Sequence, residues 1–179
     1  MPLIGQEEKN AVAEVMNSPI LVHGPRAIQF EQDFARYTKS EIVVSVSSCT
    51  AGLHLFWFIN NIGPGDEIIV PAMTHVATVH SLEYLGAKPV FVDVDEETGN
   101  IDIDLIEEQI SDRTKGICVV HYLGVPVDMD KINDIASRHK LLVLEDCALA
   151  LGSRFNGRHV GLHGDAGSFS FYPVKHITT

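Results

Sequence analysis

Short apolar runs that alternate with helical segments are the feature that most constrains how this chain can fold. The runs at residues 43–46 and 141–144 are nearly continuous in apolar character and do not alternate strictly between apolar and polar. Such runs are typical of strands that helices cover on both faces. The sequence therefore predicts an α/β fold with a mostly parallel central sheet and helices on both of its faces.

The expected elements follow one another in a βα order after two initial helices. We expect helices over residues 6–17, 27–38, 50–60, 74–85, 103–110 and 128–139. We expect strands over residues 42–46, 67–70, 89–92, 116–120 and 141–144, and an alternating strand from residue 167 that stops at Pro173. No repeat or linker marks a domain boundary, so residues 1–179 are predicted to form a single unit.

Charge and composition exclude several classes of partner. The chain of 179 residues has 45% hydrophobic and 21% charged residues, which is typical of soluble globular proteins. Its formal net charge of -11 disfavours binding to nucleic acid and to anionic membranes. No apolar run reaches the roughly 18 residues of a membrane span, and the first residues lack the features of a signal peptide. We therefore expect a cytoplasmic protein whose partner is a polar small molecule.

Neither the cysteines nor the histidines form a convincing metal or disulfide pattern. Cys49, Cys118 and Cys147 are odd in number and far apart, so we expect reduced thiols. The nine histidines include no HxxxH or HxH pair on a convincing helix or strand. Scattered structural or surface histidines are the better interpretation, and no metal site is predicted, although a zinc protein stays open as an alternative.

Polar residues follow several of the expected strands, at the edge of a parallel sheet where ligands bind. Small and hydroxyl-bearing residues at positions 47–52 close one strand and open a helix. The free backbone N–H groups and the positive helix end at this point suit a phosphate. Taken alone, these residues are more simply explained as an ordinary helix N-cap, since Ser and Thr are preferred there.

An acid and a lysine follow two other strands. Glu145 and Asp146 come directly after an apolar run, where a carboxylate can keep a pyridine nitrogen protonated. Lys175 follows the last expected strand, and a lysine in a desolvating cleft can form an imine with an aldehyde. Taken singly, a capping acid and a surface lysine are the simpler interpretations. All three groups nevertheless fall at strand ends, where one ligand could contact them all.

Along its whole length, the chain resembles the N-terminal part of fold-type I pyridoxal-phosphate (PLP) enzymes of the DegT/StrS sugar aminotransferase group. The matching stretches occur in unbroken order: Gly24 with Phe30-Glu31, Ser48-Cys49-Thr50, Gly63-Pro64-Gly65-Asp66-Glu67, Pro71 with Val76-Ala77-Thr78, Gly86-Ala87-Lys88-Pro89-Val90-Phe91-Val92-Asp93, Val120-His121, Glu145-Asp146, Gly164-Asp165, and Ser168-Phe169-Ser170 ahead of Lys175.

This resemblance implies that the chain binds pyridoxal 5'-phosphate. Lys175 would form the Schiff base with the cofactor, and Asp146 would face its pyridine nitrogen. Cys49 and Thr50, through backbone and hydroxyl donors, and Ser170 would bind the phosphate.

The resemblance also implies which groups pack on the cofactor ring. His75 stands where the family usually has a stacked aromatic ring, and Ala148 would pack on the opposite face. After Asp146 the family commonly has Ala-Ala followed by Gln or His, whereas this chain has Cys147-Ala148-Leu149. A polar partner for the phenolic oxygen of the cofactor is therefore not expected here.

The activity implied by the resemblance is amino-group transfer, from a donor expected to be L-glutamate, to a nucleotide-linked keto-sugar in amino-sugar and polysaccharide biosynthesis. A homodimer is expected, since in this family each subunit completes the site of the other. The related sugar dehydratases have His at the place of Lys175, so they are the less favoured alternative. A catalytically silent fragment or binding module with this fold is the other alternative.

The resemblance covers the N-terminal part of the PLP-binding large domain, so the C-terminal small domain of the family is expected to be absent from this chain. In the family, an antiparallel strand that follows the lysine is inserted beside the first strand. Without it, the expected strand at residues 42–46 would lack a neighbour and leave backbone groups unpaired.

Overall fold

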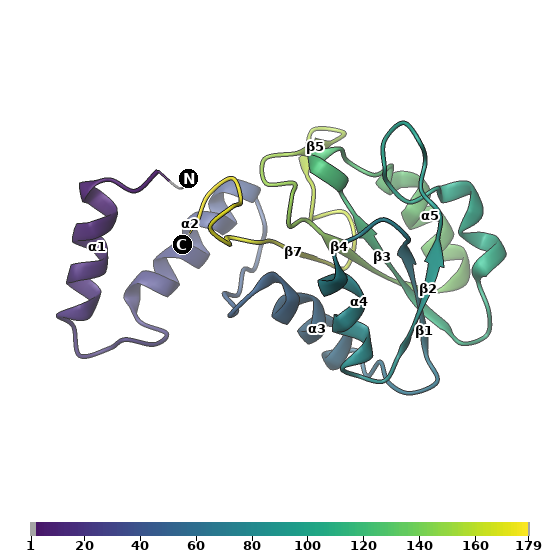
Figure 1. The fold of residues 1–179 in the computed structure, drawn as a ribbon, viewed down its shortest axis with the longest axis horizontal. Helices are drawn as coiled ribbons and strands as arrows, with labels where there is room; N and C mark the ends of the chain where they lie inside the picture. Colours follow the sequence, from purple (N-terminus) through teal and green to yellow (C-terminus); the bar gives the residue numbers. More distant parts are fainter. Residues whose placement is uncertain (1–2, 179) are drawn as a thin grey trace.

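The computed structural model describes residues 3–178 and contains a five-stranded sheet in the order β2-β1-β3-β4-β7 (Figure 1). Each neighbouring pair in this sheet runs parallel. The helices are α1 (Gln6–Met16), α2 (Pro25–Thr38), α3 (Cys49–Ile59), α4 (Val76–Glu83) and α5 (Met129–His139), with the short 3-10 helices η1 (Ile103–Leu105), η2 (Glu107–Gln109) and η3 (Tyr122–Gly124). The strands are β1 (Glu67–Pro71), β2 (Lys88–Val92), β3 (Thr114–Val120), β4 (Leu142–Asp146), β5 (Arg154–Phe155), β6 (Arg158–His159) and β7 (Ala166–Ser168).

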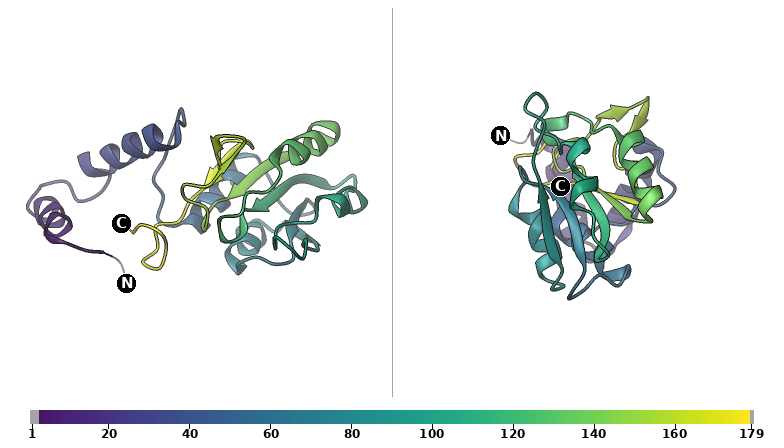
Figure 2. Two further views of the ribbon diagram at one scale, coloured as in Figure 1. Left: turned by 90° about the horizontal axis from the view of Figure 1, so that it is seen from above. Right: turned by 90° about the vertical axis from the view of Figure 1, so that its right-hand side faces the viewer.

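Two apolar cores lie on opposite faces of this sheet. Successive residues of a strand point to opposite faces, so neighbours in the sequence separate into different cores. In β1, Ile69 belongs to the core that contains α5, whereas Ile68 and Val70 belong to the core that contains α3 and α4. This arrangement confirms the predicted α/β fold with a mostly parallel sheet covered on both faces (Figure 2).

The first two helices extend away from the sheet (Figures 1 and 2). No residue of α1 is buried, and α2 buries Phe34 and Thr38. Pro at the first position of α2 suits a helix start, because the missing N–H has no partner there in any case. Among the described helices, none combines the length and the apolar character that crossing a membrane requires.

Residues 42–46 do not form the predicted strand. They are extended but pair with no other strand, and the side chains of Ile42 and Val44 are exposed. A strand needs a neighbouring backbone to satisfy its N–H and C=O groups, and within residues 3–178 no strand pairs with this segment. The segment is attached to α2 instead, because Glu31 Oε1 accepts hydrogen bonds from Ser45 N (2.7 Å) and Ser45 Oγ (2.6 Å).

The helix predicted over residues 103–110 is replaced by two short 3-10 helices, η1 and η2. Ile106 N bonds to the carbonyl of Ile103, three residues earlier, and Asp102 caps the start of η1. A 3-10 helix brings side chains three positions apart onto one side. Ile103 and Ile106 therefore both contact the core beside α5.

The last strand is shorter than predicted. Its pairing with β4 ends where Ser168 lies opposite Asp146, the last residue of β4. Beyond that point the chain packs on α2, where Phe34 contacts the rings of Phe169 (5.1 Å between centroids) and Phe171 (5.4 Å). Aromatic contacts with α2 therefore replace strand pairing and lead the chain toward Lys175.

The β5–β6 hairpin was not predicted. The strands β5 and β6 form an antiparallel hairpin that turns at Asn156 and Gly157, with φ of 47° and 79°. Asn-Gly is a favoured pair for a two-residue hairpin turn, because both positions need positive φ. This dipeptide is the signal that could have predicted the hairpin.

The amino end of the sheet is held by a buried carboxylate. Glu67 Oε1 lies 2.8 Å from Arg113 Nη2 and 3.2 Å from Lys88 Nζ, and Glu67 Oε2 accepts from Ser111 Oγ at 2.7 Å. The hydrogen bond from Ser111 is the main cause that lowers the pKa of Glu67 to about 2, and the two cations add to it. The cluster joins β1, β2 and the residues that precede β3.

This cluster predicts how stability depends on pH. The folded chain lowers the pKa of Glu67 from 4.5 to about 2, so its contribution is complete above pH 4.5 and is lost as the pH falls toward 2. Urea unfolding at several pH values should show that Glu67→Gln is less stable than the wild type above pH 4.5. The difference should shrink toward pH 2. Glu96→Gln, which removes an exposed carboxylate, is the control, and equal losses in the two variants would contradict the prediction.

Candidate functional site

Three of the predicted site residues meet at the carboxyl end of β4. Asp146 is the last residue of β4, and Cys49 is the first residue of α3. Their side chains approach each other, with Cys49 Sγ 3.9 Å from Asp146 Oδ1. Lys175 lies close enough for its positive charge to lower the pKa values of both Asp146 and Cys49. The structure therefore brings together an acid, a lysine and a helix N-terminus from distant parts of the sequence.

Asp146 is 4% exposed, and each of its carboxylate oxygens has a hydrogen-bond donor. Ala148 N donates to Oδ1 at 3.0 Å, and the Thr78 hydroxyl donates to Oδ2 at 2.8 Å. Burial raises the pKa of Asp146, whereas these two donors and the charge of Lys175 oppose the rise. A cationic ring nitrogen beside Asp146 would strengthen the ionised form further.

The first turn of α3 leaves donors free for an anion. Ser48 Oγ accepts from Ala51 N at 3.1 Å, and Ser48 O accepts from Gly52 N. Among residues 3–178, the backbone N–H groups of Cys49 and Thr50 have no hydrogen-bond acceptor. Ser48 can therefore act as the N-cap of α3 while the N–H groups of Cys49 and Thr50 stay free. These two donors fit a phosphate.

Cys49 contributes a neutral thiol to this site. Burial is the main cause that raises the pKa of Cys49 to about 12, and the nearby Asp146 carboxylate raises it as well. A thiolate would repel a phosphate group, so the protonated thiol is compatible with an anion at the start of α3. Cys49, Cys118 and Cys147 are all free thiols.

Ser168 joins the start of α3 to the end of β7. Its hydroxyl donates to the carbonyl oxygen of Cys49 at 3.0 Å, and its side chain is buried. A Cβ atom at Gly52 would lie 2.5 Å from Ser168 Oγ, so only glycine allows this close approach. Ser168 and Gly52 thus set the distance between the phosphate-binding turn and the sheet.

The segment that carries Ser170 and Lys175 leaves the sheet beyond Ser168. Ser170 Oγ accepts from Tyr172 N at 3.4 Å, and a turn follows in which Lys175 N donates to Tyr172 O at 2.8 Å. Within residues 3–178, the Lys175 amino group makes no hydrogen bond, and none joins Ser170 to Cys49 or Thr50.

His75 lies at the N-cap of α4, where Nδ1 of its ring accepts from Ala77 N at 3.1 Å. The ring is exposed and stands three residues before Thr78, which binds Asp146. Ala148 follows Asp146 and contributes its backbone N–H to the carboxylate. Thr78 was included in the family motif without a role, and only the folded chain shows its contact with Asp146.

A second buried acid supports the site from the other side of β4. Glu145 Oε2 lies 2.8 Å from His121 Nε2 and also accepts from Gly161 N at 2.6 Å. Glu145 Oε1 accepts from the backbone of His163 and Gly164 at 2.7 Å each. Burial raises the pKa of Glu145, but the bonds from His121 and these amides outweigh it and lower the pKa overall. Glu145 therefore anchors the loop that follows β4.

His121, Glu145 and Cys147 could form a metal site by proximity alone, since their ligand atoms lie within 4.8 Å of one another. However, His121 Nδ1 accepts from Val127 N at 3.1 Å, so the proton of the neutral ring is on Nε2 and points to Glu145. Both ring nitrogens and both carboxylate oxygens are already used in hydrogen bonds. The cluster is better explained as a structural network.

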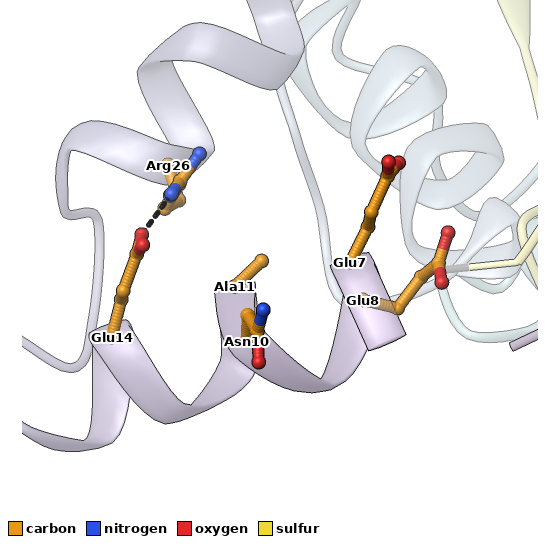
Figure 3. A pocket seen from close by; sticks show the side chains of 6 residues that line it. All are labelled: Glu7, Glu8, Asn10, Ala11, Glu14 and Arg26. Atoms are coloured by element: carbon orange, nitrogen blue, oxygen red, sulfur yellow. Dashed lines mark hydrogen bonds and ion pairs between the residues drawn. The ribbon is translucent and has the colours of Figure 1, made fainter. Parts of the chain in front are cut away.

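A pocket between α1 and α2 is separate from these residues (Figure 3). The single cation of its lining, Arg26, is paired with Glu14. Such a predominantly acidic pocket is unsuited to a phosphate, and it includes none of the predicted site residues. Its lining residues are Glu7, Glu8, Asn10, Ala11, Glu14 and Arg26.

Known proteins share the sequence pattern and the fold of this chain. Residues 2–179 match the model of the DegT/DnrJ/EryC1/StrS aminotransferase family. The chain belongs to this family. The resemblance predicted from the motifs is thereby confirmed, and aminotransferases of this family depend on PLP.

Individual members of the family are similar over almost the whole chain. UDP-4-amino-4-deoxy-L-arabinose--oxoglutarate aminotransferase of Shewanella sediminis is 44% identical over 99% of the chain and 46% of its own length. The crystal structure of an aminotransferase from Psychrobacter cryohalolentis has a TM-score of 0.95 and 41% identity, covering 99% of this chain and 45% of that one. A putative sugar aminotransferase from Streptococcus pneumoniae, solved in a PLP form, has a TM-score of 0.95 and 33% identity over 99% of this chain and 49% of its own. The chain thus spans just under half the length of these relatives.

The close contact between α3 and β7 can be tested by Gly52→Ala. The new Cβ would overlap Ser168 Oγ, so the variant should lose about 1–3 kcal/mol of unfolding free energy. Adding Ser168→Ala should recover part of the loss, because it removes the overlapping oxygen. Urea denaturation measures both effects.

Gly63→Ala is the matched control, since its nearest atom would be 3.9 Å away. This control should stay within about 1 kcal/mol of the wild type. A Gly52→Ala variant as stable as this control would show that the contact is not tight.

Proposed function

We propose that this chain forms the cofactor-holding part of a PLP-dependent sugar aminotransferase that transfers an amino group from L-glutamate to a nucleotide-linked keto-sugar. The observation that carries the proposal is the meeting of Lys175, Asp146 and the free donors of α3 at the carboxyl ends of the strands. A ligand with an aldehyde, a basic ring nitrogen and a phosphate matches these three groups. PLP has all of them, and when bound it supplies an electron sink for reactions at the carbon that bears the amino group.

Each residue has a defined task in this proposal. Lys175 Nζ would hold the cofactor covalently and, once free, would carry a proton between the α-carbon of the amino donor and the cofactor. The Asp146 carboxylate accepts a hydrogen bond from the pyridine N–H and keeps that nitrogen protonated. The N–H groups of Cys49 and Thr50 bind the phosphate at the positive end of α3.

Two further assignments complete the proposed cofactor site. The Ser170 hydroxyl joins the phosphate donors, since it lies two residues beyond Ser168, which binds the start of α3. The exposed ring of His75 covers one face of the cofactor, and Ala148 packs on the other.

The substrates proposed here are supported by the name of the Shewanella relative. That name joins a UDP-linked amino sugar to oxoglutarate, which is the product that L-glutamate leaves after losing its amino group. Sugar aminotransferases also occur among the similar solved structures. The sugar itself would be bound by residues outside the contacts described above.

We further propose that the protein acts as a homodimer in the cytoplasm. Helix α1 and the loop that follows it expose apolar side chains that a second subunit could cover, among them Val12 (63% exposed), Met16 (69%) and Val22 (72%). The three free thiols fit a reducing compartment.

Lys175→Ala tests the central assignment. Titration with PLP should give the wild type the visible absorbance band of a lysine-bound cofactor, and the variant should lack that band because it lacks the amine proposed to form the bond. Lys131→Ala, which removes an exposed lysine on α5, should keep the band. The same band in the wild type and in Lys175→Ala would reject this role for Lys175, and no band in the wild type would favour the silent module.

The amino donor can be tested with the same band. Adding L-glutamate to the PLP-loaded wild type should remove the visible band and release oxoglutarate in equal amount, because the amino group passes to the cofactor. Oxoglutarate is quantified with a coupled dehydrogenase assay. D-glutamate is the control, and equal conversion by both enantiomers would contradict an enzymatic transfer.

A further inference from the structure

Two threonines stand behind the Asp146 carboxylate. Thr78 is fully buried, and its Oγ1 lies 2.8 Å from Asp146 Oδ2. Thr74 Oγ1 lies 2.8 Å from Thr78 Oγ1. Thr74 lies just before α4 and Thr78 lies in its first turn, so the start of this helix places a hydroxyl group at the end of β4.

The direction of these hydrogen bonds follows from the charge of the acid. An ionised carboxylate can only accept, so Thr78 must donate its single hydroxyl proton to Asp146. Thr78 Oγ1 can then only accept from Thr74, which is the first donor in this series of hydrogen bonds. Donors in such a series polarise one another, so Thr74 strengthens the bond that Thr78 makes to the carboxylate.

Thr78 and Ala148 fix both oxygens of Asp146. Ala148 N approaches Oδ1 and Thr78 approaches Oδ2, so rotation of the carboxylate would break at least one bond. Thr78 also lies in the first turn of α4, where the positive end of the helix favours a nearby negative charge. Both effects favour the ionised acid in a place where burial raises its pKa.

Other titratable groups also act on Asp146 and must be considered in any measurement of its ionisation. They come from α3, from β3 and its end, from the loop after β4, and from the segment after β7: Cys49, Cys118, His121, Cys147 and Lys175. Among all the groups around Asp146, Thr78 is the one whose hydroxyl can be removed by an isosteric substitution that leaves every charge in place.

The same turn also carries His75. Thr74 and Thr78 flank this residue, and His75 caps α4 through Ala77 N. The hydroxyl that binds the acid and the ring proposed to cover the cofactor thus both lie at the start of α4.

We propose that Thr78, supported by Thr74, is a positioning residue that keeps the Asp146 carboxylate ionised and oriented toward the ring nitrogen of the cofactor. The orientation part of this proposal rests on the proposed PLP function. The effect on ionisation does not, because it is a property of the chain without cofactor.

The first test uses the protein without cofactor. The pKa of Asp146 is measured by NMR of carboxyl-labelled aspartate, with Asp146→Asn identifying the signal. Thr78→Val removes the hydroxyl at constant shape and should raise this pKa by about one unit. Thr78→Ser should restore the wild-type value, and Thr74→Val should give a smaller rise.

Ser81→Ala is the matched control. Ser81 is also buried on α4, but its hydroxyl donates to Thr78 O at 2.6 Å and does not contact Asp146. Its substitution should leave the pKa of Asp146 unchanged. An unchanged pKa in Thr78→Val would overturn the proposal. If circular dichroism shows that Thr78→Val does not fold, Thr74→Val decides: a raised pKa supports the proposal, and an unchanged one overturns it.

The second test measures PLP binding from the visible absorbance band. A one-unit rise in the pKa of the acid lowers the ratio of ionised to neutral form about tenfold, so Thr78→Val should weaken PLP binding by up to about tenfold at a pH below that pKa, and by less at a pH well above it. Thr78→Ser and Ser81→Ala should bind as the wild type does. Failure of the wild type to bind PLP would reject the proposed function, while the NMR titration would still decide the role of Thr78. Normal binding by Thr78→Val at an unchanged pKa would reject the role of Thr78 alone.

Discussion

The Asp146 carboxylate is buried at the end of β4, and a charge in such a place requires hydrogen-bond donors and a nearby cation. Much of the local architecture supplies them: α4 contributes a hydroxyl, the chain after β4 contributes a backbone N–H, and the segment after β7 brings a lysine. The parallel order of the strands makes this possible, because it places the carboxyl ends of β1, β4 and β7 at one edge.

The two acids at the end of β4 serve opposite faces of the sheet. Asp146 faces the start of α3, whereas Glu145 binds His121 and the backbone of the following loop. Because successive side chains in a strand alternate, one dipeptide can both build a site and anchor the loop beside it. The opposite end of the sheet is held by Glu67 in the same way, through ionic and hydroxyl partners from neighbouring segments.

The parts of the fold that could be predicted are those with a strong local pattern. The apolar strands from β1 to β4 were placed within a few residues, and so were the five α-helices. The predictions failed where structure depends on a partner rather than on the residue itself. Residues 42–46 have strand-like composition but no neighbouring backbone, and the last strand ends at Ser168 because its partner β4 ends at Asp146. The 3-10 helices at residues 103–109 were mistaken for one helix, since isoleucines three apart suit both.

The sequence by itself determined the class of fold and the chemical groups at the strand ends, because apolar runs and the residues that follow them are local features. It identified Lys175, Asp146 and the start of α3 as candidates, and the family resemblance assigned their roles. Only the tertiary structure decided how these groups support one another. The bond from Thr78 to Asp146 joins residues 68 positions apart, and the bond from Ser168 to the carbonyl of Cys49 joins residues 119 apart. Such contacts depend on the register between packed elements, which no local pattern in the chain encodes.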